Sequence, residues 1–335
     1  MAKIAINGFG RIGRQFMRYA FGDPDFDIVA VNDLTDTKTL AYLLKYDSIY
    51  GRYDKEVKSA DGHFEVDGKE IKVFFEKDPL KLPWKDLGVD IVIESTGFYT
   101  DAAKAKVHLD AGAKRVVITA PATGELDTAL VGVNDTIFKN GPKTITSNAS
   151  CTTNAAAPVV QILKESFGIK KAFLQTVHGY TATQKLVDGP DAKDLRRGRA
   201  AAVNIVPSTT GAAESVIKTV GGLEGIFDGI AIRVPVITGS LVMITALLSR
   251  TTTKDEINDV FRKAAKDARW QKSLSVTEDP IVSSDVIGEP YGAIVDAALT
   301  KVVDGDLATV YSWYDNEAGY TATLVEHVRR VGAGL

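Results

Sequence analysis

Short apolar runs alternate with helical patterns over the first 150 residues of the chain. Several runs are rich in β-branched residues and end in Gly, Asn, Ser or Pro, and they lie at residues 4–6, 28–31, 71–75, 90–93, 115–119 and 144–146. Helical periodicity occupies residues 11–21 and 102–111 between some of them. This alternation predicts a parallel sheet with helices on both faces.

The pattern changes after residue 150. Longer, half-polar strands are expected at residues 171–177, 229–234, 241–249 and 308–313, and helices at residues 153–167, 211–219, 254–268 and 316–331. A polar and basic loop, residues 179–199, interrupts them. Strands of this kind indicate a mixed or antiparallel sheet that helices cover on one side.

Composition restricts the class of protein. The 335 residues are too many for one ordinary core, and 45% hydrophobic with 25% charged residues is typical of a globular protein. A net charge of -3 gives no general attraction to nucleic acid or anionic membranes. One cysteine excludes an internal disulfide, and neither a signal peptide nor an apolar span is recognisable, so we expect a cytoplasmic protein.

A glycine motif follows the first strand and opens the first helix. Gly8, Gly10 and Gly13 have the spacing of a dinucleotide fingerprint, in which they make the turn, admit the pyrophosphate and let helix and strand pack. Asp33 ends the second strand, where a carboxylate binds ribose hydroxyls and repels a 2′-phosphate. The motif therefore predicts a Rossmann domain that binds NAD rather than NADP.

The single cysteine, Cys151, stands among small and hydroxyl residues before an alanine-rich run. A thiol at a helix N-terminus feels the positive end of the helix dipole, which lowers its pKa and favours a nucleophilic thiolate. The alternative is a small buried residue without chemistry.

Among the four histidines, His178 differs because it ends an apolar strand and precedes a glycine. The alternative to a catalytic role is a structural histidine with satisfied hydrogen bonds. Paired with Cys151, its imidazole would favour the thiolate and exchange protons with a substrate. With NAD, such a pair suits the oxidation of an aldehyde through a thiohemiacetal and a thioester, with backbone N–H groups stabilising the oxyanion.

Residues suited to anions lie in the second half. Arginines gather at residues 193–199, Thr210 and Gly211 precede a helix, and Arg233 ends a strand. The alternatives are an ordinary helix cap for the threonine, and a solvated face or a contact between subunits for the arginines.

Taken together, these residues resemble the phosphorylating glyceraldehyde-3-phosphate dehydrogenases of glycolysis. The resemblance runs nearly end to end, through residues 6–14, 32–34, 94–97, 147–154, 193–197 and 312–317. It implies a homotetramer that takes glyceraldehyde 3-phosphate, inorganic phosphate and NAD, with no metal, no membrane and no nucleic acid as a partner. It also implies a Rossmann NAD-binding domain at 1–149, to which the C-terminal helix 315–335 returns, and an α+β catalytic domain at 150–314.

The resemblance also implies residue roles. It makes Cys151 the nucleophile and His178 the base that activates it. The positions that match NAD contacts are Arg11, Ile12, Asp33, Lys77, Thr119 and Asn316. The positions that match the substrate phosphate site are Thr181, Arg197 and Arg233, and those that match the surroundings of Cys151 and the inorganic phosphate are Ser150, Thr152, Thr210 and Gly211.

Two other functions stay open on the same residues. Erythrose 4-phosphate would need the same phosphate-binding threonine and arginine, so the sequence does not separate the two aldehydes. A non-catalytic protein that binds NAD or RNA on this fold is the other alternative, and the retained Cys151, His178 and Arg233 argue against it.

The chain departs from the family pattern in several places. Gly179 stands where many relatives have serine, and Ala155 stands where most have a second cysteine. Residues 187–190 differ from the Leu-Pro pair of many NAD-specific members, which bears on the preference for NAD. Residues 123–126 and 237–240 are also unusual, so the loop geometry there is open.

Overall fold

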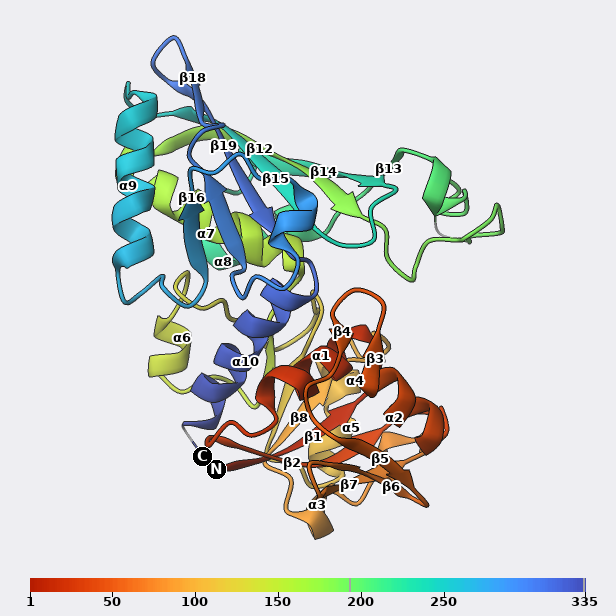
Figure 1. Cartoon of the computed structure of the whole chain (residues 1–335). Coiled ribbons are helices and arrows are strands. Elements are labelled where there is room, and N and C mark those ends of the chain that lie inside the picture. Colours follow the sequence, from red (N-terminus) through yellow and green to blue (C-terminus); the bar gives the residue numbers. More distant parts are fainter. Residues whose placement is uncertain (193, 334) are drawn as a thin grey trace. The chain divides into compact units, whose positions relative to one another are not determined.

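The structure is a computed structural model that describes residues 1–192, 194–333 and 335 (Figure 1). The chain forms two compact units. Unit 1 contains Met1–Ala129, Asp135–Ala149 and Leu324–Leu335, and unit 2 contains Leu130–Asn134 and Ser150–Thr323. Lys193, the first residue of the basic cluster, lies outside the described residues.

Unit 1 is built on a nine-stranded sheet in the order β10-β11-β9-β8-β1-β2-β7-β6-β5. The strands are β1 (Ala2–Asn7), β2 (Phe26–Asn32), β5 (Val57–Ala60), β6 (His63–Val66), β7 (Lys69–Phe74), β8 (Ile91–Glu94), β9 (Arg115–Ile118), β10 (Asp127–Thr128) and β11 (Ile145–Ser147). All neighbours are parallel except β5–β6 and β6–β7. The predicted parallel sheet is confirmed, and its order reverses between β1 and β8, where open α/β sheets bind ligands.

The helices of unit 1 are mostly short. They are α1 (Arg11–Ala20), α2 (Thr37–Lys45), α3 (Trp84–Leu87), α4 (Ala102–Ala105), α5 (Val107–Asp110) and α6 (Thr136–Lys139), with a 3-10 turn η1 (Pro79–Lys81) and a small strand pair β3 (Tyr46–Asp47) and β4 (Gly51–Arg52). The single helix predicted at 102–111 is instead α4 and α5, which meet at Lys106. Helix α2 is not among the helices expected from the sequence, although Asp36 caps it by accepting the N–H of Thr39.

Unit 2 contains an eight-stranded sheet in the order β13-β14-β12-β15-β19-β17-β16, with β18 beside β19. The strands are β12 (Ile169–Gly179), β13 (Val206–Ser208), β14 (Phe227–Val234), β15 (Ser240–Leu248), β16 (Leu274–Thr277), β17 (Ala293–Asp296), β18 (Lys301–Val303) and β19 (Leu307–Tyr314). The pairs β12–β14 and β16–β17 are parallel and the others antiparallel. The predicted mixed sheet is therefore confirmed.

One face of this sheet is covered by helices. They are α7 (Cys151–Phe167), α8 (Ala212–Val220) and α9 (Lys254–Lys266), with short 3-10 turns η2 (Ala201–Val203) and η3 (Ser283–Val286). Burial alternates along β15, where Val242, Ile244 and Ala246 are fully buried and the residues between them are half-exposed. Because α7 contacts β12, β15, β17 and β19, it forms the centre of this core.

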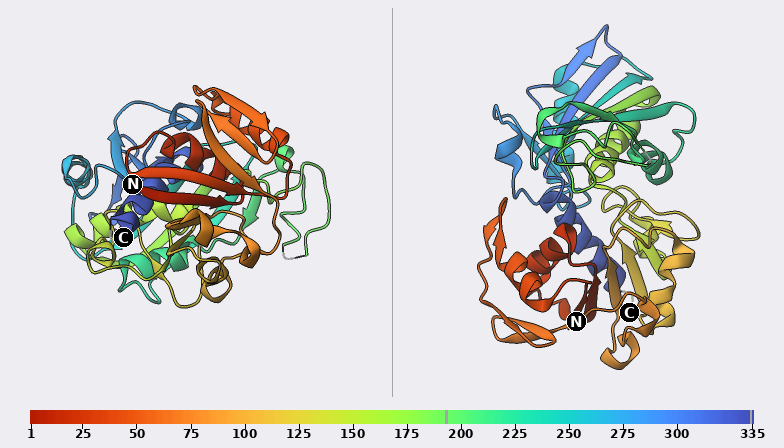
Figure 2. Two further views of the ribbon diagram at one scale, coloured as in Figure 1. Left: turned by 90° about the horizontal axis from the view of Figure 1, so that it is seen from below. Right: turned by 90° about the vertical axis from the view of Figure 1, so that its right-hand side faces the viewer.

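The C-terminal helix α10 (Ala318–Gly332) begins in unit 2, and its residues from Leu324 belong to unit 1. Its last turns hold unit 1 through polar contacts. His327 is fully buried between the Thr146 hydroxyl, 2.8 Å from Nε2, and the Ala129 carbonyl, 3.0 Å from Nδ1. Arg329 pairs with Asp23 and Asp25 near the N-terminus, and Figure 2 shows the two termini side by side. No helix in the described part of the chain is long and apolar enough to cross a bilayer.

Candidate active site

The cysteine is the first residue of α7. It lies at the helix N-terminus, as expected, although the helix begins two residues before the predicted start at 153. Ser150 caps the helix, because its hydroxyl oxygen accepts the N–H of Thr153 at 3.1 Å. The connection from β11 is so short that Ala149 adopts a φ of 53°, in the left-handed region that alanine rarely enters. This tight strand-to-helix turn keeps Cys151 at the helix end, where it retains partial solvent exposure.

His178 comes to the same place from β12. Its Nε2 lies 3.4 Å from Sγ of Cys151, so the structure brings the two predicted partners into contact. In the sheet, His178 is in register with Arg233 of the parallel strand β14. The pairing of β12 with β14 therefore places a guanidinium beside the imidazole, a neighbour that chain separation alone does not reveal.

The other ring nitrogen of His178 has two neighbours. Nδ1 lies 2.6 Å from the Gly179 carbonyl oxygen and 2.5 Å from Nη1 of Arg233, and that Nη1 also donates to the same carbonyl at 3.1 Å. Because a guanidinium only donates, the Arg233 contact uses the Nδ1 lone pair and the carbonyl contact uses an Nδ1–H, so the two belong to different tautomers. In the tautomer whose Nδ1–H donates to the carbonyl, Nε2 carries the lone pair that faces the thiol. Burial, and then the Arg233 charge, lower the pKa of His178 to about 3, so the imidazole is neutral at pH 7.

Burial and nearby charge also determine the pKa of the Cys151 thiol. Burial raises the pKa of Cys151, while the Arg233 charge and the Thr152 backbone N–H act in the opposite direction. The prediction that the helix terminus lowers the pKa of this thiol is therefore wrong for this structure, because desolvation is the larger effect. Both shifts favour the neutral thiol and the neutral imidazole over an ion pair.

Tyr314, which the sequence analysis gave no role, closes the site from β19. Its hydroxyl lies 2.9 Å from Oγ1 of Thr152 and 2.8 Å from Oγ1 of Thr176, and its ring meets the His178 ring edge-on at 5.9 Å between centroids. Burial raises the pKa of Tyr314, so it stays neutral. Tyr314 fixes the plane of the His178 imidazole by packing against it. In the sequence, the one feature that could have pointed to a role for Tyr314 was its place at the end of an amphipathic strand.

The predicted anion residues of unit 2 have well-defined partners. Arg197 donates from Nε to Oγ of Ser208 at 2.7 Å and from Nη2 to the Thr209 carbonyl at 3.1 Å. Burial lowers the pKa of Arg233, and the positive charge of Arg197 adds to this effect. Two guanidinium groups that repel each other form a place where an anion is stabilised.

Threonines and a helix end accompany these arginines. Thr210 accepts the N–H of Ala212, the first residue of α8, but the N-cap residue of this helix is Gly211, so the structure does not make Thr210 an ordinary helix cap. Gly211 has no atom within 4 Å of the position a Cβ would take, which leaves the helix end open. The hydroxyls of Thr181 and Thr183 are 2.8 Å apart.

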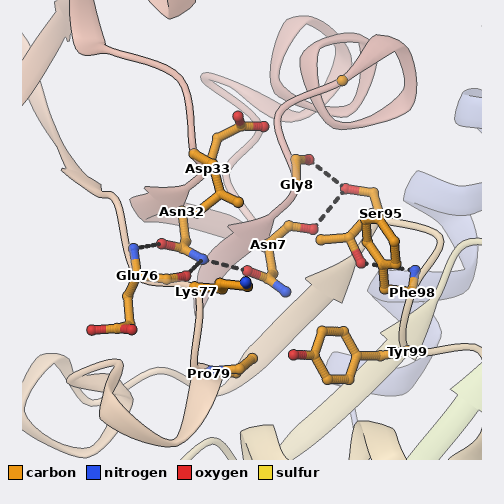
Figure 3. A pocket seen from close by; sticks show the side chains of 13 residues that line it. Asn7, Gly8, Asn32, Asp33, Glu76, Lys77, Pro79, Ser95, Phe98 and Tyr99 are labelled. Carbon is orange, nitrogen blue, oxygen red and sulfur yellow. Dashed lines mark hydrogen bonds between the residues drawn. The ribbon is translucent and has the colours of Figure 1, made fainter.

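A cavity of about 490 Å³ opens at the carboxyl ends of the strands of unit 1 (Figure 3). It is lined by Asn7, Gly8, Gly10, Asn32, Asp33, Leu34, Glu76, Lys77, Pro79, Ser95, Thr96, Phe98 and Tyr99. Asp33 accepts the Phe9 N–H on Oδ2 at 2.8 Å and the Thr35 N–H on Oδ1 at 3.1 Å, which holds its carboxylate at the rim. Each oxygen keeps a second lone pair for a ribose hydroxyl.

The glycines of the fingerprint fit a dinucleotide. A Cβ on Gly13 would lie 2.2 Å from the Gly8 carbonyl oxygen, so this glycine is required for α1 to pack on β1. Gly10, in contrast, has no atom within 4 Å of a Cβ position, which leaves backbone open to a pyrophosphate. Leu34 and Phe98 line the cavity and stay 67% and 81% exposed, as apolar walls for a base would.

Only some of the predicted cofactor residues line this cavity. Asp33 and Lys77 do, whereas Arg11 pairs with Asp47 and Thr119 follows β9, where its N–H donates to the Glu94 carbonyl. The remaining two, Ile12 on α1 and Asn316 after β19, are not among its lining residues.

Sequence reasoning missed the polar network under the cavity. Asn32 forms two hydrogen bonds with the backbone of Glu76 and donates to Oδ1 of Asn7 at 2.7 Å, which fixes the loop that carries Lys77. Asn7 in turn donates to Glu94 at 2.6 Å, and Glu94 lies 2.9 Å from Nε2 of His108. These side chains are fully buried and far apart in the chain, so no local pattern points to them.

The departure at Gly179 has a local cause. A Cβ there would lie 2.9 Å from the Val236 carbonyl oxygen, closer than real Cβ atoms come. The segment at 236–238 packs directly on this glycine, and the Tyr180 N–H donates to the same carbonyl at 3.0 Å. A serine at position 179 would thus require this segment to move.

Comparison with known proteins agrees with this geometry. A family model described as the NAD binding domain of glyceraldehyde 3-phosphate dehydrogenase matches residues 2–102, and one described as its C-terminal domain matches residues 150–316. The chain is 53% identical to a glyceraldehyde-3-phosphate dehydrogenase of Thermotoga maritima over 328 residues, which cover 97% of this chain and 98% of that protein. It is 50% identical to one of Clostridium acetobutylicum, with 97% of each chain covered, and 51% identical to one of Mycobacterium bovis, with 99% of each covered.

Proposed function

The chain belongs to the glyceraldehyde-3-phosphate dehydrogenase family, and we propose that it oxidises D-glyceraldehyde 3-phosphate with NAD and inorganic phosphate to 1,3-bisphosphoglycerate. The observation that carries this proposal is the contact of Cys151 with His178, beside the guanidinium of Arg233. We assign NAD binding to residues 1–149, with the C-terminal helix 315–335, and the chemistry to residues 150–314.

Cys151 and His178 have complementary roles. Nε2 of His178 takes the thiol proton as Sγ bonds to the aldehyde carbon, and the proton then passes to the new oxygen, which gives a thiohemiacetal. When bound, NAD supplies the acceptor for the hydride that leaves this carbon. His178 accepts the hydroxyl proton at the same time, which leaves a thioester on Cys151, and phosphate attack then releases the acyl phosphate and restores the thiol.

The charge of Arg233 explains how a weakly basic imidazole can act. A guanidinium beside Nδ1 disfavours the protonated ring. An anionic phosphate on Arg233, Arg197 and Thr181 offsets that charge, so substrate binding raises the pKa of His178 and makes it a better base. Thr210 and Gly211 at the start of α8, with Ser150 and Thr152 beside the thiol, are our candidates for the attacking phosphate.

The cofactor residues that we propose are Arg11, Ile12, Asp33, Lys77, Thr119 and Asn316. The cavity supports part of this proposal, because Asp33 and Lys77 line it and Gly10 leaves backbone open. The Asp33 carboxylate repels a 2′-phosphate, so NAD is the preferred dinucleotide.

We also propose a homotetramer. On the sheet face opposite α7, Phe173, Ile230 and Leu307 are 36–41% exposed on neighbouring strands, and Leu186 and Leu195 of the basic loop are more than 80% exposed. Exposed apolar side chains of this kind are consistent with a contact between subunits. A cytoplasmic location and the absence of nucleic-acid partners accompany this proposal. Light scattering that gave one chain per particle would contradict the tetramer.

A steady-state assay tests the proposed reaction. NADH formation should require glyceraldehyde 3-phosphate, NAD and phosphate, each omitted in turn, with arsenate able to replace phosphate. Faster turnover of erythrose 4-phosphate would assign the other aldehyde. RNA retardation in a gel, without oxidation of either aldehyde, would instead support the non-catalytic alternative.

A further inference from the structure

Ser240, the first residue of β15, is a buried hydroxyl between two groups of the site, and it is only 2% exposed. Its Oγ accepts the Gly179 N–H at 3.2 Å and donates to Oδ1 of Asn316 at 3.1 Å. The carbonyl of the same glycine lies 2.6 Å from Nδ1 of His178. One side chain therefore connects the loop that orients His178 with the amide of Asn316.

Thr238 also contacts Asn316, but its hydroxyl has a second acceptor. Its hydroxyl lies 3.2 Å from Oδ1 of Asn316 and 3.1 Å from Oδ1 of Asp315, and a single proton is divided between the two. Asp315 is a carboxylate, which is the stronger acceptor. Among the described residues, the Ser240 proton has Asn316 as its one recorded acceptor, so Ser240 dominates the orientation of this amide.

The orientation of the Asn316 amide follows from these bonds. If the amide were flipped, its NH2 would face Oγ of Ser240, and the proton of Ser240 would have no acceptor among the described residues. With Oδ1 turned to the hydroxyls, the NH2 group has no recorded acceptor in the described part of the chain. Asn316 is 6% exposed as a residue, and its NH2 group is not among the fully buried atoms that lack a partner, so it is accessible to a carbonyl oxygen on a ligand.

The backbone holds the two hydroxyls in place. Gly239, between them, has a φ of +86°, and a Cβ there would lie 2.2 Å from the Ser283 carbonyl oxygen. This packing pins the unusual segment at 237–240 against η3, so the hydroxyl positions do not depend on a flexible turn.

We propose that Ser240 is a positioning residue that orients the Asn316 amide toward the bound cofactor and, through Gly179, the imidazole toward Cys151. This inference rests on the proposed function, which supplies the roles of Asn316 and His178. Ser240 touches neither the substrate nor the sulfur, so it acts only through these neighbours. A single hydroxyl thereby links cofactor binding to the reactivity of the thiol.

The test compares Ser240→Ala with Thr238→Val, which removes the hydroxyl that does not bond to Gly179. Two measurements need no aldehyde: NAD affinity by calorimetry, and the rate of Cys151 alkylation by iodoacetamide as a function of pH. We expect Ser240→Ala to weaken NAD binding about 3- to 10-fold and to slow alkylation at pH 7 by a similar factor, the loss of one buried hydrogen bond. Thr238→Val should weaken NAD binding about 2- to 3-fold and leave the alkylation profile unchanged.

Several results would overturn the proposal. One is a Ser240→Ala variant with wild-type NAD affinity and a wild-type rate of Cys151 alkylation. Another is a Thr238→Val variant in which NAD affinity and alkylation change as much as they do in Ser240→Ala. Should Ser240→Ala not fold, Ser240→Thr keeps the hydroxyl and must retain NAD affinity and the alkylation profile. A folded Ser240→Thr that loses both would show that the hydroxyl is not the cause. A wild-type chain that bound NAD yet oxidised no aldehyde would contradict the proposed function alone.

Discussion

The buried neutral imidazole of His178 should make the protein sensitive to acid. Its pKa is about 3 in the folded chain against 6.5 ordinarily, so between these values the unfolded chain binds a proton that the folded chain excludes. The contribution of His178 to the free energy of unfolding is fully present above pH 6.5 and is lost as the pH falls toward 3. At pH 4.5, two units below the ordinary value, the loss is about 2.7 kcal/mol at about 1.36 kcal/mol per unit.

The measurement is urea unfolding at pH 6.5 and 4.5, at one protein concentration, for wild type and His178→Gln. Glutamine does not titrate, so the variant should lose about 2.7 kcal/mol less of its unfolding free energy between the two pH values than wild type does. His63→Gln, on the partly exposed strand β6, is the matched control and should follow wild type. Equal losses for wild type and His178→Gln would refute the reasoning.

Three further substitutions test other parts of the site. Cys151→Ser should abolish aldehyde oxidation while NAD still binds in calorimetry, and appreciable residual turnover would point to another nucleophile. Asp33→Gly should raise kcat/KM with NADP relative to NAD, because the charge that repels a 2′-phosphate is removed; an unchanged ratio would mean that the carboxylate does not face the ribose. Gly179→Ala should destabilise the chain by about 1–3 kcal/mol in thermal unfolding, since its methyl group meets the Val236 carbonyl, and a wild-type Tm would contradict that contact.

The fold was largely predictable where local patterns carry it. The strands predicted at 4–6 and 28–31 are β1 and β2, each longer by one or more residues at both ends. The expected helix at 153–167 begins at Cys151, because Ser150 supplies the cap. The helix predicted at 102–111 is two short helices in the structure, because the chain turns at Lys106. The alanine-rich sequence of this segment gives no indication of that turn.

The sequence pointed to candidate site residues only by their type and their position in a predicted element, and it did not show their contacts. His178 stood out because it ended a strand before a glycine, whereas His108 looked like an ordinary helical residue and is a buried partner of Glu94. Tyr314 lay inside a recognised motif without any sign of its bonds to Thr152 and Thr176. Contacts of this kind join residues more than a hundred positions apart, which no local spacing encodes.

The sequence by itself determined the glycine turn, the strand and helix pattern, and the cysteine at a helix start, because each depends on neighbours along the chain. Only the tertiary structure decided the protonation of the pair. Burial favours the neutral forms of both Cys151 and His178, against the expectation from the helix dipole. The approach of Arg233 from β14 adds to this effect for His178 and opposes it for Cys151. The physical reason is that desolvation and charge act through space, and packing sets both.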